Sequence, residues 1–231
     1  ALEMTKQEAL TEIRRRMEVD FFDDLLMGNI RSPELANQRL MSLGFPVGLL
    51  AAVVVVSIDD FDSLRQMGYG TTAIEEIRDK LGETIRGLAD RRNPRPVVVS
   101  RSDSVIAILP LRSLPACSDE CLGFAEEVMV SVKRIMPSIS ASAGLSYAFS
   151  ESIQLPSAYK EAVTALEIVR ATKDKGSCGF IGDLEVYRFL YEYPDHKSLA
   201  QMISTSIKPL LDYHKENNTE LYKTLSVVLT R

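Results

Sequence analysis

Residues 49–61 read LLAAVVVVSIDDF, and this stretch decides the fold. Its first eight residues, 49–56, form the longest apolar run in the chain. The run has the length of one buried β-strand and is far too short to span a membrane. Gly48 precedes the run and Asp59 ends it, so we predict a buried strand over residues 49–58.

Helix and strand patterns alternate after this first strand. Apolar residues recur every three or four positions in the helical segments, whereas β-branched residues cluster in the strand segments. We expect a capping box of Thr72 and Glu75 at the first helix, and a hairpin turn at residues 102–104. The predicted elements, in order, are a helix over 74–88, strands over 97–101 and 105–109, a helix over 122–136, a strand over 139–149, a helix over 158–169 and a strand over 178–181.

The predicted order β-α-β-β-α-β, followed by α-β, is that of a ferredoxin-like split βαβ core with an extension. We therefore assign the chain to the α+β class, as a two-layer α/β fold with a long N-terminal helix and a C-terminal all-helical extension. Right-handed crossovers lead us to expect the helices on one face of the sheet. The expected domains are linker and signalling helices over 1–45, the core over 46–182 and a helical segment over 183–231.

The long N-terminal helix carries an apolar stripe of Leu10, Ile13, Met17 and Phe21. Two interpretations stay open: the stripe packs on the chain's own domain, or it pairs with a second copy in a two-stranded dimer. We expect a mixture, in which the earlier turns form the dimer interface and a second set of side chains docks on the domain. That docked set is Phe22, Leu25 and Leu26.

A short second helix follows the first. Ser32 is a typical N-cap residue, and Pro33 suits the first helical position. Gly44 is the expected end of this helix, because glycine readily adopts the left-handed conformation found there.

The composition excludes several classes of protein. With 45% hydrophobic residues and a net charge of −5, the chain is an ordinary globular protein. We interpret the basic clusters at residues 14–16 and 91–92 as solvated surface and not as a nucleic-acid-binding patch. The sequence shows no secretory signal and no membrane span, so we expect a cytoplasmic protein. Its three cysteines lack a disulfide or zinc spacing, and we expect reduced thiols.

The core resembles the GGDEF-type nucleotide cyclase domain in layout. In that family the first strand ends in an Asp-x-Asp-x-Phe pattern, whose first aspartate holds the catalytic metal. Here Ser57 stands at the metal position, while Asp59 and Phe61 match the rest of the pattern.

The family's signature hairpin has also changed. Where the family reads Gly-Gly-Asp-Glu-Phe, residues 101–105 read Arg-Ser-Asp-Ser-Val. Asp103 alone matches, because Arg101 and Ser102 replace the glycines and Ser104 replaces the glutamate.

These replacements remove what nucleotide cyclisation requires. Two divalent cations and a triphosphate need carboxylates, and Ser57 supplies none. Glycines let a backbone approach a phosphate closely, whereas Arg101 and Ser102 carry side chains. We therefore expect no catalytic residues, no metal and no cofactor. Asp59 or Asp60 is expected to cap the following turn, and a lone cation held by Asp59, Asp60 and Asp62 is the alternative.

A cyclase-like core without its motif, followed by helices, resembles the PucR/CdaR family of bacterial transcription regulators. Four stretches carry this resemblance: FFDDLLMGN at 21–29, SAYKEA at 157–162, IKPLLDY at 207–213 and TELYKTL at 219–225. The last two resemble the lead-in to the family's helix-turn-helix. The recognition helix itself is absent from the sequence, so we expect a fragment of a longer regulator.

The resemblance implies a catalytically inactive regulatory and dimerisation domain. It implies a homodimer that contacts DNA only through the missing C-terminal domain, a small-molecule effector at an absent upstream sensor, and no membrane. The alternative is a domain that itself senses a small molecule or nucleotide, on the sheet face under Ser57, Arg101 and Asp103. An active nucleotide cyclase is a further alternative.

Overall fold

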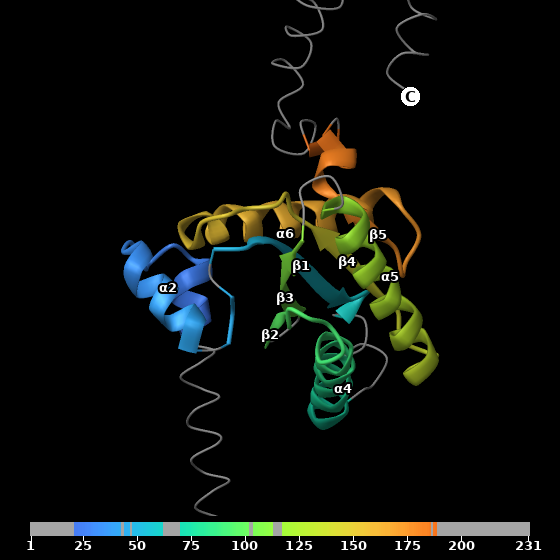
Figure 1. Ribbon diagram of the computed structural model, residues 1–231. Helices are drawn as coiled ribbons and strands as arrows, with labels where there is room; N and C mark the ends of the chain where they lie inside the picture. The colour runs from blue at the N-terminus through green and yellow to red at the C-terminus, as the bar shows by residue number, and fades with distance from the viewer. Residues whose placement is uncertain are drawn as a thin grey trace, which may run out of the picture. The chain divides into compact units, whose positions relative to one another are not determined.

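The computed structural model describes residues 21–42, 44–46, 48–61, 70–101, 104–112, 117–185 and 187–188 (Figure 1). The chain divides into two compact units, residues 1–185 and 186–231, and all elements named below belong to the first. A helical segment, residues 21–26, opens this part. It is followed by α2 (Pro33–Ser42), β1 (Leu50–Ile58), α4 (Thr71–Ala89), β2 (Val97–Ser100), β3 (Ser104–Leu111), α5 (Cys117–Ile135), β4 (Ala141–Leu145), the short helix η1 (Ser152–Gln154), α6 (Leu155–Thr172), β5 (Cys178–Phe180) and the short helix η2 (Ile181–Leu184). Within the described ranges, no helix has the length and apolar content to cross a membrane.

Strand β1 is the centre of a five-stranded sheet with the order β2-β3-β1-β4-β5. It runs antiparallel to both neighbours, β3 and β4, and the edge strand β5 runs parallel to β4. Every residue of β1 after Leu50 is buried, as the continuous apolar run predicts. The strand order and directions are those of a ferredoxin-like core with a fifth strand added, which confirms the predicted α+β fold.

Helices cover both faces of the sheet (Figure 1). Successive residues of a strand point to opposite faces. The even-numbered residues of β1 from 52 to 58 share a core with α4 and α5, whereas the odd-numbered residues from 51 to 55 share another with α6 and residues 21–26. The expectation that the helices lie on one face was therefore wrong. The crossover rule predicts that α6, which joins the parallel strands β4 and β5, lies on the same face as α4 and α5, whereas α6 covers the second apolar face of β1.

Strand β4 is shorter than predicted, because it ends at Leu145 and not at Phe149. Ser146 binds the backbone of β1 in a different way: the N–H of Val53 donates to its Oγ at 2.9 Å, and its own N–H donates to the carbonyl of Val53 at 3.0 Å. Regular strand pairing stops there, and Phe149 meets Ala51 again in an isolated bridge.

The predicted capping box at Thr72 and Glu75 was wrong. Helix α4 begins at Thr71, so Gly70 takes the N-cap position and provides no side-chain cap. Thr72 therefore lies inside the first turn, where its hydroxyl is past the position from which a cap acts.

Helix α2 begins and ends as predicted. Pro33 is its first residue, and the N–H of Leu35 donates to Ser32 Oγ at 3.3 Å. Gly44 ends the segment with a φ of 82°, which confirms the expected left-handed glycine.

The end of the N-terminal helix packs into the domain. Phe22, Leu25 and Leu26 are buried in the core that they share with α6, as predicted. Phe21, which we expected at a dimer interface, is only 8% exposed in the same core, and the guanidinium of Arg39 lies 5.4 Å from the centre of its ring. For Phe21 the expectation was wrong, because the ring is already covered within the chain. The other stripe residues, Leu10, Ile13 and Met17, lie outside the described residues.

Candidate functional site

Three serines stand side by side across the sheet at the end of β1. Ser57 pairs with Ser104 of β3 on one side and with Ser142 of β4 on the other. Directly paired residues point to the same face of a sheet, and all three side chains are buried. Uncharged hydroxyl groups therefore occupy this row, including the position at Ser57 where the resemblance would place a metal-binding carboxylate.

Asp59 follows the serine row, and its carboxylate is bound by other groups of the same chain. Its side chain is only 5% exposed. Ser140 Oγ donates to Asp59 Oδ2 at 2.6 Å, and the backbone N–H of Gly176 donates to the same oxygen at 2.9 Å. The Nε of Arg170 lies 3.5 Å from Asp59 Oδ1. The carboxylate thus ties the end of β1 to the approach to β4, to α6 and to the loop after α6.

The neighbouring contacts strengthen this tie. Arg170 also donates from Nη2 to the carbonyl of Ile58 at 2.7 Å. Asp60, which adopts a left-handed φ of 52°, forms an ion pair with Lys175 in the loop after α6. Lys175 Nζ also donates a hydrogen bond to Asp60 Oδ2. This hydrogen bond, and then the negative charge of the Asp60 carboxylate, raise the pKa of Lys175. Asp59 and Asp60, one of which we expected to cap the following turn, therefore both hold the α6–β5 loop, and residues 62–69 of that turn lie outside the described residues.

A small cavity of about 100 Å³ lies beside these contacts. It is lined by Asp59, Asp60, Ser142, Arg170, Lys173 and Lys175. Three cationic groups against two carboxylates disfavour an added cation. Across the described ranges, no three His, Cys, Asp or Glu side chains group closely enough to hold a metal ion, and Asp62 lies outside those ranges. The hydroxyl of Ser142 has no hydrogen-bond partner among the described atoms.

Arg101, at the first glycine position of the signature hairpin, joins three parts of the domain. Its backbone N–H donates to the carbonyl of Ser104 at 2.8 Å, which closes the predicted hairpin turn. Its Nη1 donates to the hydroxyl of Tyr159 in α6 at 2.9 Å, and its Nε lies 3.1 Å from Asp23 Oδ1 in the N-terminal helix. The guanidinium is thereby held on the α6 side of the sheet. Ser102 and Asp103 lie outside the described residues.

Sequence reasoning identified Asp59 and Arg101 but missed their partners. Asp23, Tyr159 and Arg170 all belong to helices, where a polar residue on an apolar pattern is ordinary. Asp23 and Tyr159 even lie in the stretches that carry the regulator resemblance, but no local pattern connects them with the hairpin. The connection exists only after α6 and residues 21–26 share one face of the sheet.

Comparison with known proteins gives a family and several similar folds. A family model described as a GGDEF-like domain matches residues 27–168. Three similar solved structures are an EAL/GGDEF domain protein from M. capsulatus (17% identity, 62% of this chain and 92% of that one, TM-score 0.48), the diguanylate cyclase SiaD from Pseudomonas aeruginosa in complex with its activator SiaC (14%, 77% and 72%, 0.49), and a diguanylate cyclase/phosphodiesterase from Caldicellulosiruptor saccharolyticus (12%, 64% and 86%, 0.43). No curated protein matches the chain.

Proposed function

Because the chain belongs to the family of GGDEF-like domains, we propose that it is a catalytically inactive regulatory domain of a bacterial transcription regulator. The parent protein is of the PucR/CdaR type and works in the cytoplasm. An upstream sensor binds a small-molecule effector, this domain passes the signal on, and a helix-turn-helix domain of the parent protein contacts DNA.

The contacts of the Asp59 carboxylate are the observation that supports catalytic inactivity. A metal-bound triphosphate needs carboxylates that are free to bind cations. Asp59 already accepts two hydrogen bonds and faces Arg170, and Ser57 offers only a hydroxyl. Freeing Asp59 for a metal would break its links to α6 and the α6–β5 loop. These residues therefore act as a cross-link and not as a catalytic centre.

The contacts of Arg101 support the proposal that the domain passes a signal on. Asp23 lies on the N-terminal helix, which would arrive from an upstream sensor, and Tyr159 lies on α6. Helix α6 leads through β5 towards residue 185, where the first compact unit ends. A shift of the N-terminal helix would pull on Arg101 and so reach the hairpin and α6 together.

The proposed domain acts as a homodimer, because a palindromic operator requires a two-fold protein. Leu10, Ile13 and Met17 would pair with the same residues of a second copy. Light scattering on the chain and on an Ile13→Asp variant tests this: we expect a dimer that dissociates in the variant. A strict monomer at high concentration would remove the dimer from the proposal.

Turnover assays test the proposal that the domain is catalytically inactive. The chain is incubated with GTP or ATP and Mg²⁺, and release of pyrophosphate is followed. We expect no more product than in a sample without protein, while an active diguanylate cyclase in the same buffer gives product. Product that is formed by the chain and lost in the Asp59→Asn variant would refute the proposal.

A sensing role of the domain itself is the second candidate. The cavity beside Asp59 favours it, because Ser142, whose hydroxyl has no hydrogen-bond partner among the described atoms, lines the cavity together with Arg170 and Lys173. A ligand of this cavity would raise the midpoint of thermal unfolding by mass action. Nucleotides and purine catabolites are the compounds to test, and the Lys173→Gln variant should lose the response.

A further inference from the structure

Strand β2 forms one edge of the sheet, with a neighbouring strand on one side only (Figure 1). Arg101 donates its backbone N–H to the carbonyl of Ser104 at 2.8 Å, so these two residues form a hydrogen-bonded pair of the β2–β3 hairpin. Bonded and non-bonded pairs alternate along antiparallel strands, and Val99 therefore also bonds to β3. The backbone N–H and C=O groups of Val98 and Ser100 consequently point away from β3, towards the edge of the sheet.

These outward groups have no hydrogen-bond partner among the residues that the structure describes. Arg86 in α4 donates to Ser100 at 3.5 Å, but it binds the hydroxyl and not the backbone. Val98 and Ser100 are both half-buried, and a backbone group that is shielded from water needs a partner. The edge of β2 thus offers two donors and two acceptors to an incoming strand.

The opposite edge of the sheet, β5, is protected by a lysine. Ala143 in β4 pairs with Cys178 and donates its N–H to the carbonyl of Ser177 at 3.0 Å, so the carbonyl of Cys178 points away from β4. Lys173 Nζ donates to that carbonyl at 3.1 Å. A lysine over an edge is a common defence against pairing with another chain, whereas the β2 sequence, VVVS, carries no charge.

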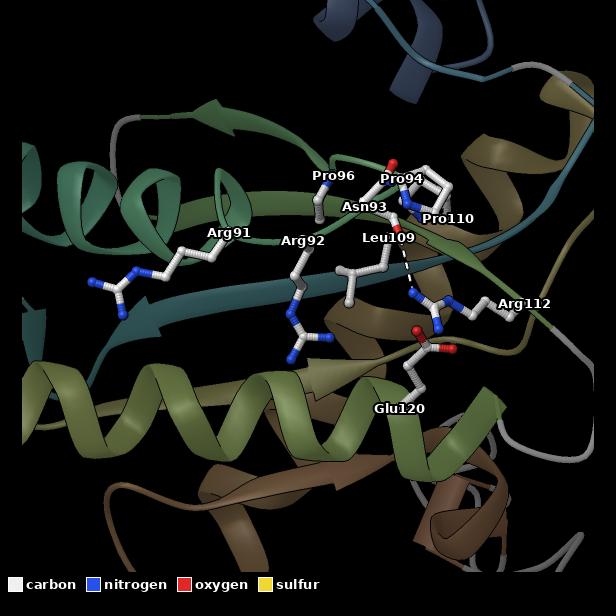
Figure 2. Close-up of a pocket in the computed structure, with 9 residues that line it drawn as sticks. All are labelled: Arg91, Arg92, Asn93, Pro94, Pro96, Leu109, Pro110, Arg112 and Glu120. Carbon is white, nitrogen blue, oxygen red and sulfur yellow. Dashed lines mark hydrogen bonds between the residues drawn. The ribbon is translucent and has the colours of Figure 1, made fainter.

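The loop before β2 fixes the position of this edge. Figure 2 shows Pro96 directly before the strand and the hydrogen bond from Arg112 Nη2 to the carbonyl of Asn93, at 3.1 Å. Arg92 forms an ion pair with Glu127 of α5 at 3.1 Å. Solvated surface was therefore the wrong interpretation of Arg92. A strand that is held in place loses little freedom when it pairs with a partner.

Two copies of β2 complement each other when they pair antiparallel about Val99. In this register Val98 lies opposite Ser100 of the second copy, and Ser100 lies opposite the Val98 of that copy. Two hydrogen bonds form in each of these pairs and join all the outward groups. A register shifted towards Pro96 would leave the carbonyl of Ser100 opposite a proline, which has no N–H to donate.

The same pairing suits the N-terminal helix. Two antiparallel copies of one strand are related by a two-fold axis perpendicular to the sheet, which keeps the same face of both sheets on the same side. Phe22 shares a core with Val99 on the α6 side. The N-terminal helices of the two copies would therefore end on one side of the joined sheets, as a parallel helix pair requires.

We propose that β2 pairs antiparallel with β2 of a second copy and extends the sheet across the dimer. This inference rests on the proposed homodimer, because two four-residue strands form too small an interface to hold the copies together alone. The paired N-terminal helices keep the two edges close, and a contact that is linked in this way needs little affinity of its own.

Disulfide cross-linking tests the register. Val99→Cys places two thiols opposite each other at the two-fold axis, where Cα atoms of a non-hydrogen-bonded pair lie about 4.5 Å apart and within disulfide range. Val97→Cys is the matched control, because Val97 packs in the same core but lies opposite Arg101 of the second copy. After mild oxidation we expect covalent dimers of Val99→Cys in non-reducing electrophoresis. Val97→Cys should give no more than the native chain with its three cysteines.

Amide hydrogen exchange of the native chain, resolved by residue, needs no change in β2. We expect the amides of Val98 and Ser100 to exchange at least about tenfold more slowly in the native dimer than in Ile13→Asp, because pairing protects them. Val99 is the internal control, since its N–H bonds to β3 in both states. If Val99→Cys fails to fold, this comparison decides alone.

The outcomes separate the strand pairing from the proposed dimer. Cross-linking confined to Val99→Cys, with slow exchange at Val98 and Ser100, supports the pairing. A dimer in light scattering without the cross-link, and with exchange as fast as in Ile13→Asp, overturns the pairing and leaves the helix-paired dimer in place. Equal cross-linking of Val97→Cys and Val99→Cys overturns the register and the proposal with it. A strictly monomeric native chain overturns both the dimer and the pairing.

Discussion

The guanidinium of Arg101 lies 3.1 Å from the carboxylate of Asp23, so the β2–β3 hairpin is ionically joined to the N-terminal helix. A glycine at this position, as in the GGDEF pattern, could make no such contact. One replacement thus removes a residue suited to nucleotide binding and adds a link between two parts of the domain. The same guanidinium hydrogen-bonds Tyr159, which brings α6 into the link.

The Arg101–Asp23 pair should contribute measurably to stability. In a double-mutant cycle with Arg101→Ala and Asp23→Ala, urea unfolding is expected to give a coupling energy of about 0.5–1.5 kcal/mol, because Arg101 is only 20% exposed. The matched control is Arg95 and Asp90, an ion pair of 2.7 Å whose members are both mostly exposed. Its coupling should stay below about 0.5 kcal/mol. Equal coupling in the two cycles would contradict the role given to Arg101.

The Asp59→Asn variant should lower the free energy of unfolding by about 1–3 kcal/mol. The amide keeps the shape of the carboxylate but loses the negative charge that faces Arg170 inside the domain. Asp60→Asn is the control, because its Lys175 partner is exposed and asparagine tolerates the left-handed backbone. We expect a loss below about 1 kcal/mol for the control in chemical denaturation. A harmless Asp59→Asn would mean that the carboxylate is not a cross-link.

Gly144 should tolerate no side chain. A Cβ at this position in β4 would lie 2.1 Å from the carbonyl oxygen of Ala162 and 2.3 Å from the nitrogen of Leu166, both backbone atoms of α6. Gly144→Ala would force the helix off the sheet, and we expect a loss of about 3 kcal/mol or more in thermal or urea unfolding. Gly123→Ala is the control: apart from its own helix backbone and chain neighbours, no described atom lies within 4 Å of its added Cβ, and the change in α5 should stabilise by roughly 0.5–1 kcal/mol.

Stability should fall at alkaline pH partly through Cys178. Burial, and then the charge of Glu126, raise the pKa of this thiol above its ordinary value of 9.0. The folded state therefore favours the protonated thiol, so its contribution is complete below pH 9.0 and is lost as the pH rises through the folded pKa. We expect the urea midpoint of the native chain to fall more steeply as the pH rises above 9.0 than that of Cys178→Ser. Parallel curves would contradict this assignment.

The sheet could be predicted from the sequence because its signals are local. The apolar run 49–56 and the turn residues between helices and strands fix the order of elements without reference to distant parts of the chain. The start of α4 was missed because both Gly70 and Thr72 suit an N-cap, and only the observed backbone distinguishes them. The cover on the second face was missed because the right-handed crossover rule, applied to α6 between the parallel strands β4 and β5, predicts the face that α4 and α5 cover.

The candidate site was predictable only in part. The sequence shows which residues stand at the positions of Ser57, Asp59 and Arg101, and so it shows what has been lost. What those residues do instead depends on partners far along the chain, such as Arg170 for Asp59. Charged contacts of this kind leave no periodic pattern, since a single arginine on a helix is ordinary in any sequence. Only the packing of α6 on the sheet brings them together.

A crystal structure of the chain grown with Mg²⁺ and GTP tests the central claim most directly. We expect Asp59 to keep its contacts with Ser140, Gly176 and Arg170, with neither nucleotide nor metal at the end of β1. Ordered GTP with two Mg²⁺ ions at that strand end, and an Asp59 carboxylate turned from Arg170 to a metal, would contradict the account.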